Sequence, residues 1–201
     1  RVALDAPLPG AKSHLNLAPH PHHGWRPGCV PSEARTAAGL VLLYPSSNTP
    51  YILLTVRAGD LVEHPGQVSF PGGSIKDTET IPQAALREAS EETGLCPEQV
   101  RVLGFLSSLH VAVSDFALHP VVGISDARPT FDVQTNEVGR ILEVPLSDLL
   151  NPNMLRHGEF WHRHEQIRVP YFELCEERVW GATAMILSEL IEIIGIDFRN
   201  F

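Results

Sequence analysis

The sequence has few cysteines, no long apolar run and a deficit of positive charge. The cysteines are only three among 201 residues, at Cys29, Cys96 and Cys175. They are odd in number, widely spaced and in no metal-ligand pattern, so we expect reduced thiols rather than disulfides or a zinc site. No apolar stretch approaches the roughly 20 residues of a membrane-spanning helix, and no signal-peptide pattern shows. These absences predict a cytoplasmic protein without a membrane partner.

The charge balance bears on which partners the chain can bind. Lys and Arg number 15 and Asp and Glu number 24, which gives a formal net charge of −9. Proteins that bind nucleic acid without sequence preference need a basic face, so we expect no nucleic-acid partner. An acidic chain can still bind a phosphate compound, because metal ions provide local positive charge.

Length and composition predict one globular domain with a sizeable core. Residues 1–34 contain six prolines and little periodicity, so we expect an extended arm there, rich in Pro and His, and a single domain over residues 35–201. His20, His22 and His23 sit among the prolines, and we interpret them as part of a loop or solvent-facing arm.

Apolar periodicity predicts strands interrupted by a helix in the middle of the chain and followed by one at its end. We expect a hairpin from the first two strands, and an edge position or a bulge at Pro120, since proline cannot donate to a neighbouring strand. The fold class is therefore α/β with a mixed sheet between helices. The expected strands cover 36–44, 51–57, 100–106, 116–124, 138–144, 161–173 (broken at Pro170) and 178–180, and the expected helices cover about 80–94, 145–150 and 182–194, the last with Ala184, Leu187, Ile191 and Ile194 on its apolar side and Ser188, Glu189 and Glu192 opposite.

The helix expected after Thr80 carries the strongest chemical signal. Thr80 with Gln83 forms a capping box, Pro82 is tolerated in a first turn, and Gly94 before an apolar residue is a helix stop. The last turns carry Glu88, Glu91 and Glu92.

These three carboxylates share one helix face, because residues three and four apart are neighbours there. They repel one another and oppose the helix dipole, each effect being worth about 0.3–1 kcal/mol. A hard cation such as Mg²⁺ or Mn²⁺ would turn this conflict into a metal site. Three acids alone would be more typical of a solvated acidic surface, because surface charge clusters are common.

The wider spacing favours the metal site. From Gly73 the pattern is five residues, Glu79, seven residues, Arg87-Glu88, two residues, Glu91-Glu92, one residue, Gly94-Leu95. It resembles the Nudix box at every fixed polar and glycine position, with Ala89 as the one soft departure. The resemblance implies an α/β/α sandwich and hydrolysis of a diphosphate linked to another moiety. It also implies metal ligation by Glu88, Glu91 and Glu92, and a structural role for Gly94 and for an ion pair between Glu79 and Arg87.

A second string narrows the substrate. Residues 53–73 run from Leu-Leu-Thr-Val-Arg57 to Phe-Pro-Gly72-Gly73, which resembles the signature of the coenzyme A diphosphatase branch. Val62 stands where that branch commonly has Arg, while a stretch from Trp180 onwards also resembles the branch. The implied activity cleaves coenzyme A or its derivatives to 3′,5′-ADP and 4′-phosphopantetheine (or acyl-phosphopantetheine), with Arg57, Gly72 and Gly73 at the substrate.

Other roles and functions stay open. Hydrolysis needs a base that deprotonates the attacking water. This base is either a carboxylate of the Nudix box, Glu91 or Glu92, or a glutamate later in the chain, for which Glu137 is our candidate. Arg57 could equally be a surface residue at a strand end. The rival functions are a diphosphatase for ADP-ribose, ADP-sugars or dinucleotides, a non-catalytic nucleotide-binding regulatory module, and an interaction domain. A homodimer is compatible with each.

Overall fold

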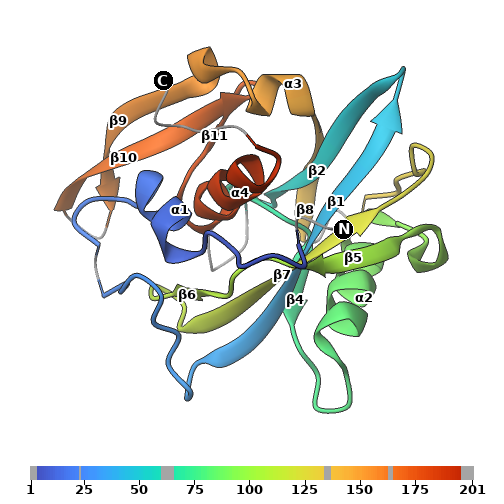
Figure 1. Cartoon of the computed structure of the whole chain (residues 1–201), viewed down its shortest axis with the longest axis horizontal. Helices are drawn as coiled ribbons and strands as arrows, with labels where there is room; N and C mark the ends of the chain where they lie inside the picture. The colour runs from blue at the N-terminus through green and yellow to red at the C-terminus, as the bar shows by residue number, and fades with distance from the viewer. Residues whose placement is uncertain (1–3, 23, 60–65, 134–136, 163–164, 196–201) are drawn as a thin grey trace.

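The computed structural model describes residues 4–22, 24–59, 66–133, 137–162 and 165–195 (Figure 1). Two β-sheets and the helices around them make up this part of the chain. The strands are β1 (Arg35–Ser46), β2 (Thr49–Arg57), β3 (Val68–Ser69), β4 (Gly72–Ser74), β5 (Arg101–Phe105), β6 (Leu109–Val111), β7 (Phe116–Ile124), β8 (Val138–Pro145), β9 (Leu155–His162), β10 (Glu165–Leu174) and β11 (Glu177–Val179). The helices are α1 (Ala11–Asn16), α2 (Ile81–Thr93), α3 (Leu146–Leu149) and α4 (Gly181–Ile193), with 3₁₀ turns η1 (Pro97–Gln99) and η2 (Pro152–Met154).

The larger sheet has the order β3-β2-β1-β7-β5, with β4 paired to β1, β6 to β7 and β8 to β2. β1 and β7 run parallel, while the other pairs are antiparallel, so the sheet is mixed. The expected hairpin of β1 and β2 is present. Its turn residues Ser47 and Asn48 both have positive φ, of 50° and 62°, which suits the twist of a two-residue hairpin loop.

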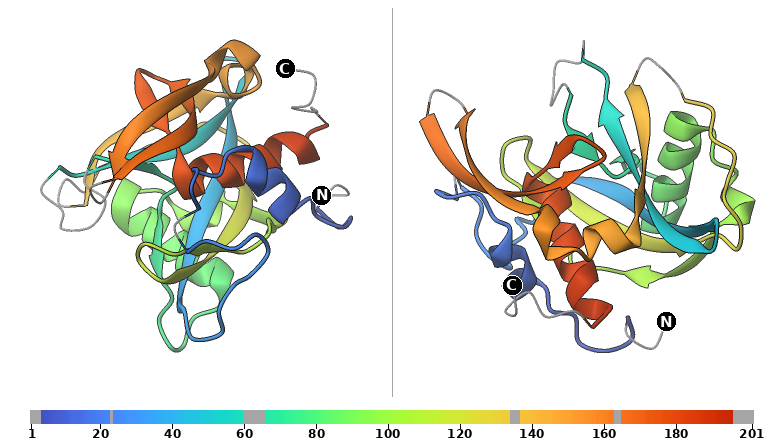
Figure 2. Two further views of the ribbon diagram at one scale, coloured as in Figure 1. Left: turned by 90° about the vertical axis from the view of Figure 1, so that its left-hand side faces the viewer. Right: turned by 90° about the horizontal axis from the view of Figure 1, so that it is seen from above.

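Helices cover both faces of this sheet. On one face α2 buries Ala84, Ala85 and Ala89 against a cluster that includes Leu40 and Leu53. On the other face α4 packs in the second core cluster, and Figure 2 shows α2 and α4 on opposite sides. The predicted α/β/α sandwich with a mixed sheet is confirmed.

Pro120 was expected at an edge or at a bulge; the edge position was wrong, whereas the pairing is irregular there, with a register shift of one residue. β7 is an interior strand, with β1 on one side and β5 and β6 on the other. The pairing with β5 begins at Val121 and the pairing with β6 ends at Leu118, so Pro120 falls between these two partners. Its carbonyl accepts a hydrogen bond from the Leu106 N–H at 3.0 Å. The missing donor therefore faces a break in the pairing, which is where a sheet tolerates proline.

The single strand expected over residues 161–173 was also wrong. The chain forms an antiparallel hairpin of β9 and β10 there, and β11 completes a second, three-stranded sheet. Pro170 does not break β10, where it pairs with His157. Because β11 pairs only with Phe172–Leu174, Pro170 lies beyond its end and needs no donor on that side.

The segment before β1 contains a helix, α1, where an extended arm was expected. α1 lies along α4 (Figure 1), and Leu17 directly after it is buried in the core. Further on, the backbone of His20 pairs with that of Arg168 in β10. The segment is thus packed on the rest of the molecule. The boundary at residue 35 between an arm and a domain is still only a prediction. His23 lies outside the described residues.

α4 is buried almost all round, from Thr183 to Ile191. The polar side expected at Ser188 and Glu189 is covered by α1, and both residues are fully buried. Ile194, expected on the apolar side, instead ends the helix and is exposed.

The three cysteines are exposed and none forms a disulfide. Within the described ranges, no helix is both long enough and apolar enough to cross a membrane.

Candidate active site

Local sequence explains where α2 begins and ends. The backbone N–H and the hydroxyl of Thr80 both donate to Gln83 Oε1, at 2.9 and 2.8 Å. At the other end Gly94 adopts a left-handed conformation with φ of 68°, and its N–H donates to the Ser90 carbonyl. A side chain at Gly94 would also collide with Asp132. These caps fix the helix that carries the acidic residues.

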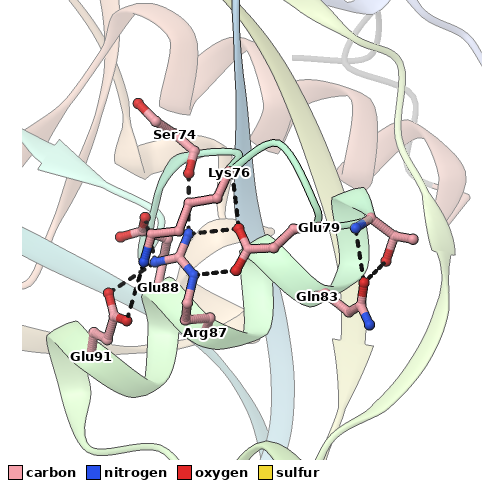
Figure 3. A network of polar contacts seen from close by, with 8 residues as sticks. Ser74, Lys76, Glu79, Gln83, Arg87, Glu88 and Glu91 are labelled. Carbon is pink, nitrogen blue, oxygen red and sulfur yellow. Dashed lines mark hydrogen bonds and ion pairs between the residues drawn. The ribbon is translucent and has the colours of Figure 1, made fainter.

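Arg87 ties the loop after β4 to α2 (Figure 3). Its Nε and Nη2 donate to the two carboxylate oxygens of Glu79 at 2.5 and 3.0 Å, and Nη2 also donates to the Ser74 carbonyl. The bond from Arg87, with a second from the Lys76 N–H, lowers the pKa of Glu79 to about 2. This bidentate pair keeps the loop on the helix.

The same guanidinium also offsets the repulsion among the acids. Its Nη1 donates to Glu88 at 2.8 Å and to Glu91 at 2.9 Å, and Lys76 Nζ lies 3.8 Å from Glu91 (Figure 3). Glu91 remains exposed, with 55% of its side chain accessible, so its carboxylate has room to turn.

Glu92 is the buried member of the acidic set, with only 4% of its surface exposed. Its Oε2 accepts a hydrogen bond from the Gly72 N–H at 3.2 Å. Burial raises the pKa of Glu92 to about 8; the Gly72 bond and Arg57 lower it, and the charges of Glu88 and Glu137 raise it further. Glu137 and Arg57 are therefore electrostatic neighbours of the acidic helix face.

Two glycines let the β4 backbone approach that face. A Cβ on Gly73 would lie 2.6 Å from the Cδ of Glu88, and a Cβ on Gly72 would lie 2.3 Å from the carbonyl oxygen of Ala38. The first contact is with a side chain that can move, while the second is with the backbone of β1. Gly73 thus sets the position of the Glu88 carboxylate, and Gly72 the pairing of β4 with β1.

We therefore predict different outcomes for two matched substitutions. Gly73→Ala should leave the melting temperature close to wild type but lower kcat, by about tenfold or more, because it displaces the Glu88 carboxylate. Gly72→Ala should lower the melting temperature, since overpacking against backbone costs about 1–3 kcal/mol. Thermal unfolding and steady-state kinetics on both variants check this. Full activity in Gly73→Ala would show that the Glu88 position does not matter.

A cavity of about 450 Å³ adjoins this face. Arg57, Gly72 and Gly73 are part of its wall, so it meets the carboxylates through the two glycines. Much of the remaining wall is apolar, including Phe70 and Ile167. The Nε of Arg57 is buried and has no hydrogen-bond partner among the described residues. The cavity is within the range of small-molecule sites.

The later carboxylate, Glu137, lies at the edge of this region. Its backbone carbonyl accepts a hydrogen bond from the N–H of Ala58, the residue after Arg57, and its side chain is exposed just before β8. The structure thus brings Glu137 near Arg57 and Glu92, which are distant in sequence. Val62 lies outside the described residues.

The donors fit a hard divalent cation in their chemistry. Carboxylate oxygens are the ligands that Mg²⁺ and Mn²⁺ prefer, and the buried Glu92 lacks a full counter-charge. As the described side chains stand, however, no three His, Cys, Asp or Glu groups are close enough to share an ion. Glu88 and Glu91 point to Arg87 instead, so the carboxylates would have to turn towards the ion.

This geometry agrees with the comparisons to known proteins. A family model of the NUDIX domain matches residues 33–174, and the chain belongs to the Nudix family. It is accordingly a hydrolase that acts on pyrophosphate bonds. A protein named "Uncharacterized Nudix hydrolase NudL" from Pectobacterium atrosepticum is 38% identical over 161 residues, which cover 79% of this chain and 82% of that relative. One of the same name from Enterobacter sp. (strain 638) is 37% identical over 163 residues, covering 81% and 84%.

Solved structures share the fold at lower identity. The Mycobacterium smegmatis Nudix hydrolase RenU superposes with a TM-score of 0.59 at 21% identity, covering 85% of this chain and 94% of that one. A Francisella tularensis bifunctional NMN adenylyltransferase/ADP ribose pyrophosphatase, complexed with AMP and a Mn ion, gives a TM-score of 0.51 at 16% identity, covering 81% and 42%.

Sequence reasoning missed part of the cavity wall. His22 and Trp25 precede the family match, and Ile167 belongs to the second sheet. Trp25 carried a signal, because a large aromatic residue in an otherwise proline-rich arm needs a surface to cover it.

Proposed function

We propose that this hydrolase cleaves the diphosphate of coenzyme A or its derivatives, with Mg²⁺ or Mn²⁺ held by Glu88, Glu91 and Glu92. The observation that carries the proposal is Arg57. Its buried Nε has no described partner, and it lies in the wall of the cavity that reaches the acidic face at Gly72 and Gly73. A guanidinium so placed suits a substrate phosphate, which it can bind through two parallel hydrogen bonds. Arg57 also belongs to the string that resembles the coenzyme A branch.

In this mechanism the metal, when bound, supplies positive charge and Lewis-acid chemistry. Arg57 binds a phosphate, and the backbone of Gly72 and Gly73 allows the diphosphate to approach Glu88 and Glu92. Glu137 takes the proton from the attacking water. A box carboxylate, Glu91 or Glu92, is the alternative base. The products are 3′,5′-ADP and 4′-phosphopantetheine, or its acyl form.

The principal alternative is hydrolysis of ADP-ribose, an ADP-sugar or a dinucleotide on the same scaffold. The bound AMP and Mn ion of the Francisella enzyme, which has a similar fold, are consistent with an adenine nucleotide and a divalent ion in either case. A regulatory module that binds nucleotide without cleaving it is the second alternative. We also propose that the protein acts in the cytoplasm and that it forms a homodimer.

Turnover of parallel substrates tests the function. Coenzyme A, an acyl-coenzyme A, ADP-ribose, NADH and a dinucleoside polyphosphate should be compared with Mg²⁺ and with Mn²⁺. We expect the highest kcat/KM for coenzyme A or its acyl form. A tenfold or greater preference for another of these substrates refutes the coenzyme A assignment.

Arg57 should determine how much the 3′-phosphate of coenzyme A matters. One charge-assisted hydrogen bond is worth about 1.5–3 kcal/mol, so we expect wild type to prefer coenzyme A to 3′-dephospho-coenzyme A by about ten- to a hundredfold in kcat/KM. Arg57→Ala should narrow that ratio, whereas Val62→Arg should widen it if the new side chain reaches the phosphate. An unchanged ratio in Arg57→Ala would show that Arg57 does not bind the 3′-phosphate.

Glu137→Gln should lower kcat more than it raises KM, since the amide cannot accept the water's proton. Removing a general base typically costs about 10²–10⁴-fold. The pH–rate profile of the variant is the measurement. If the acidic limb of the wild-type profile persists at undiminished kcat, the base is a box carboxylate.

A further inference from the structure

One wall of the cavity comes from a segment outside the family match. Pro19, Pro21, His22 and Trp25 line it, whereas the NUDIX match begins at residue 33. Figure 1 shows this part of the chain running beside β6 and β10 before it enters β1. The segment therefore adds residues to the cavity wall that the family match does not include.

The segment is held in place by defined contacts. The backbone of His20 exchanges two hydrogen bonds with Arg168 of β10, at 2.8 and 2.9 Å. The N–H of Trp25 donates to the His22 carbonyl at 2.8 Å, and His22 Nδ1 lies 2.9 Å from the Pro19 carbonyl oxygen. The His22 and Trp25 rings meet edge to face, with centroids 5.4 Å apart and planes at 81°. These bonds hold the backbone of the segment, and the Trp25 ring packs against His22 and against the core cluster.

We propose that Trp25 is the surface on which the nucleobase of the substrate stacks. This proposal rests on the proposed function and extends it to the part of the substrate remote from the bond that is cleaved. Every nucleobase has a flat π-face, and stacking on an aromatic side chain needs no matched set of hydrogen bonds. The cavity wall to which Trp25 belongs is chiefly apolar, with Leu109, Leu118 and Met185 among its residues.

A nucleobase and a pantetheine-like arm both carry polar groups that need hydrogen bonds when they are buried. The aromatic ring distinguishes between them, because only the nucleobase has a flat π-face that can stack on it. Arg57, a cationic side chain of the same wall, is an electrostatic neighbour of Glu92, which accepts a hydrogen bond from Gly72. The phosphates thus belong at Arg57 and the base at Trp25.

Equilibrium binding of two probes tests the proposal. AMP carries the base, the ribose and one phosphate, while ribose 5-phosphate lacks the base. Binding of both should be measured by calorimetry on wild type, Trp25→Leu and Trp25→Phe. The matched control is Trp161→Leu, because Trp161 is 77% exposed in β9 and is not part of the cavity wall.

We expect Trp25→Leu to weaken AMP about tenfold or more, with ribose 5-phosphate unchanged. Trp25→Phe should retain most of the affinity for AMP, and Trp161→Leu all of it. Equal weakening of both probes, no weakening of either, or no binding of AMP to wild type would overturn the proposal. Coenzyme A turnover on the same wild-type sample separates the two hypotheses: Trp25-dependent AMP binding without turnover refutes the function and supports the stacking surface.

Discussion

Glu91→Gln and Glu92→Gln should each lower kcat by at least about a hundredfold at saturating Mg²⁺. The two carboxylates and Glu88 lie on the last turns of α2, next to glycines that bring the cavity to them. An amide keeps the size of the side chain but removes the charge that, in the proposed function, would hold a divalent ion against the diphosphate. The loss should fall on kcat more than on KM, since such an ion would act on charge that develops in the transition state.

Glu98→Gln is the matched control, because Glu98 is exposed in η1 shortly after the helix. It should leave kcat and KM unchanged. Near-normal kcat in both Glu91→Gln and Glu92→Gln would refute the proposal that these carboxylates bind the metal ion.

The pH dependence of the stability of the metal-free protein tests the role of Glu92 independently of activity. Its pKa in the folded state is about 8, above its ordinary value, because the side chain is buried. The folded state therefore binds this proton more tightly than the unfolded chain, and stability is lost as pH rises from about 4.5 through 8. Glu92→Gln should melt at a higher temperature than wild type at pH 8 and at a similar one near pH 4.5. Loss of activity with this gain in stability excludes misfolding as the cause.

The parts of the site that could be predicted are local in sequence. Thr80, Gln83 and Gly94 determine α2 within its own residues, and the spacing of three and four positions alone brings the three acids to one face. The pairing of β1 and β2 is equally local, because a two-residue turn joins them. The resemblance to the Nudix box then predicted the chemistry of these acids, which is metal binding and hydrolysis of a diphosphate.

The rest depends on contacts between residues far apart in the chain. The wall at Trp25 depends on the pairing of His20 with Arg168 in β10. The apolar periodicity of one of these segments carries no information about its pairing with the other. Glu137 reaches the neighbourhood of Glu92 only through the pairing of β8 with β2. The interior position of Pro120 was missed for the same reason, since a break between β5 and β6 cannot be seen in the residues of β7.

Glu189 shows most clearly how a distant partner can reverse a sequence-based expectation. Helical spacing placed it opposite the apolar side of its helix, yet it is 0% exposed. Its carboxylate accepts hydrogen bonds from the Gly10 N–H at 2.9 Å and from the N–H and hydroxyl of Ser107 at 3.0 and 2.6 Å. His14 Nε2 lies 3.2 Å away and is also buried. One carboxylate thus joins the segment before β1, the chain between β5 and β6, and α4.

Glu189→Ala should destabilise the protein by about 3–5 kcal/mol, because it leaves a buried imidazole and the partly buried donors of Gly10 and Ser107 without their acceptor. That is a large share of the roughly 5–15 kcal/mol that stabilises a typical domain. Denaturant-induced unfolding at neutral pH is the measurement. Glu192→Ala is the control on the same helix. Glu192 is only half-buried and accepts one hydrogen bond, from the buried Ser13 hydroxyl, so its loss should cost less, about 1–3 kcal/mol.

The pH dependence of the Glu189 effect follows from its environment. Burial alone would raise the pKa of Glu189, but the hydrogen bonds from His14, Ser107 and Gly10 outweigh burial and lower it. A carboxylate with a lowered pKa stabilises the folded state above its ordinary pKa, and this contribution is lost as pH falls through the folded value. The difference in unfolding free energy between wild type and Glu189→Gln should therefore be largest near neutral pH and shrink in acid. A difference that stays constant across this range would mean that the variant loses only packing, and that the charge of Glu189 does not hold α1 on α4.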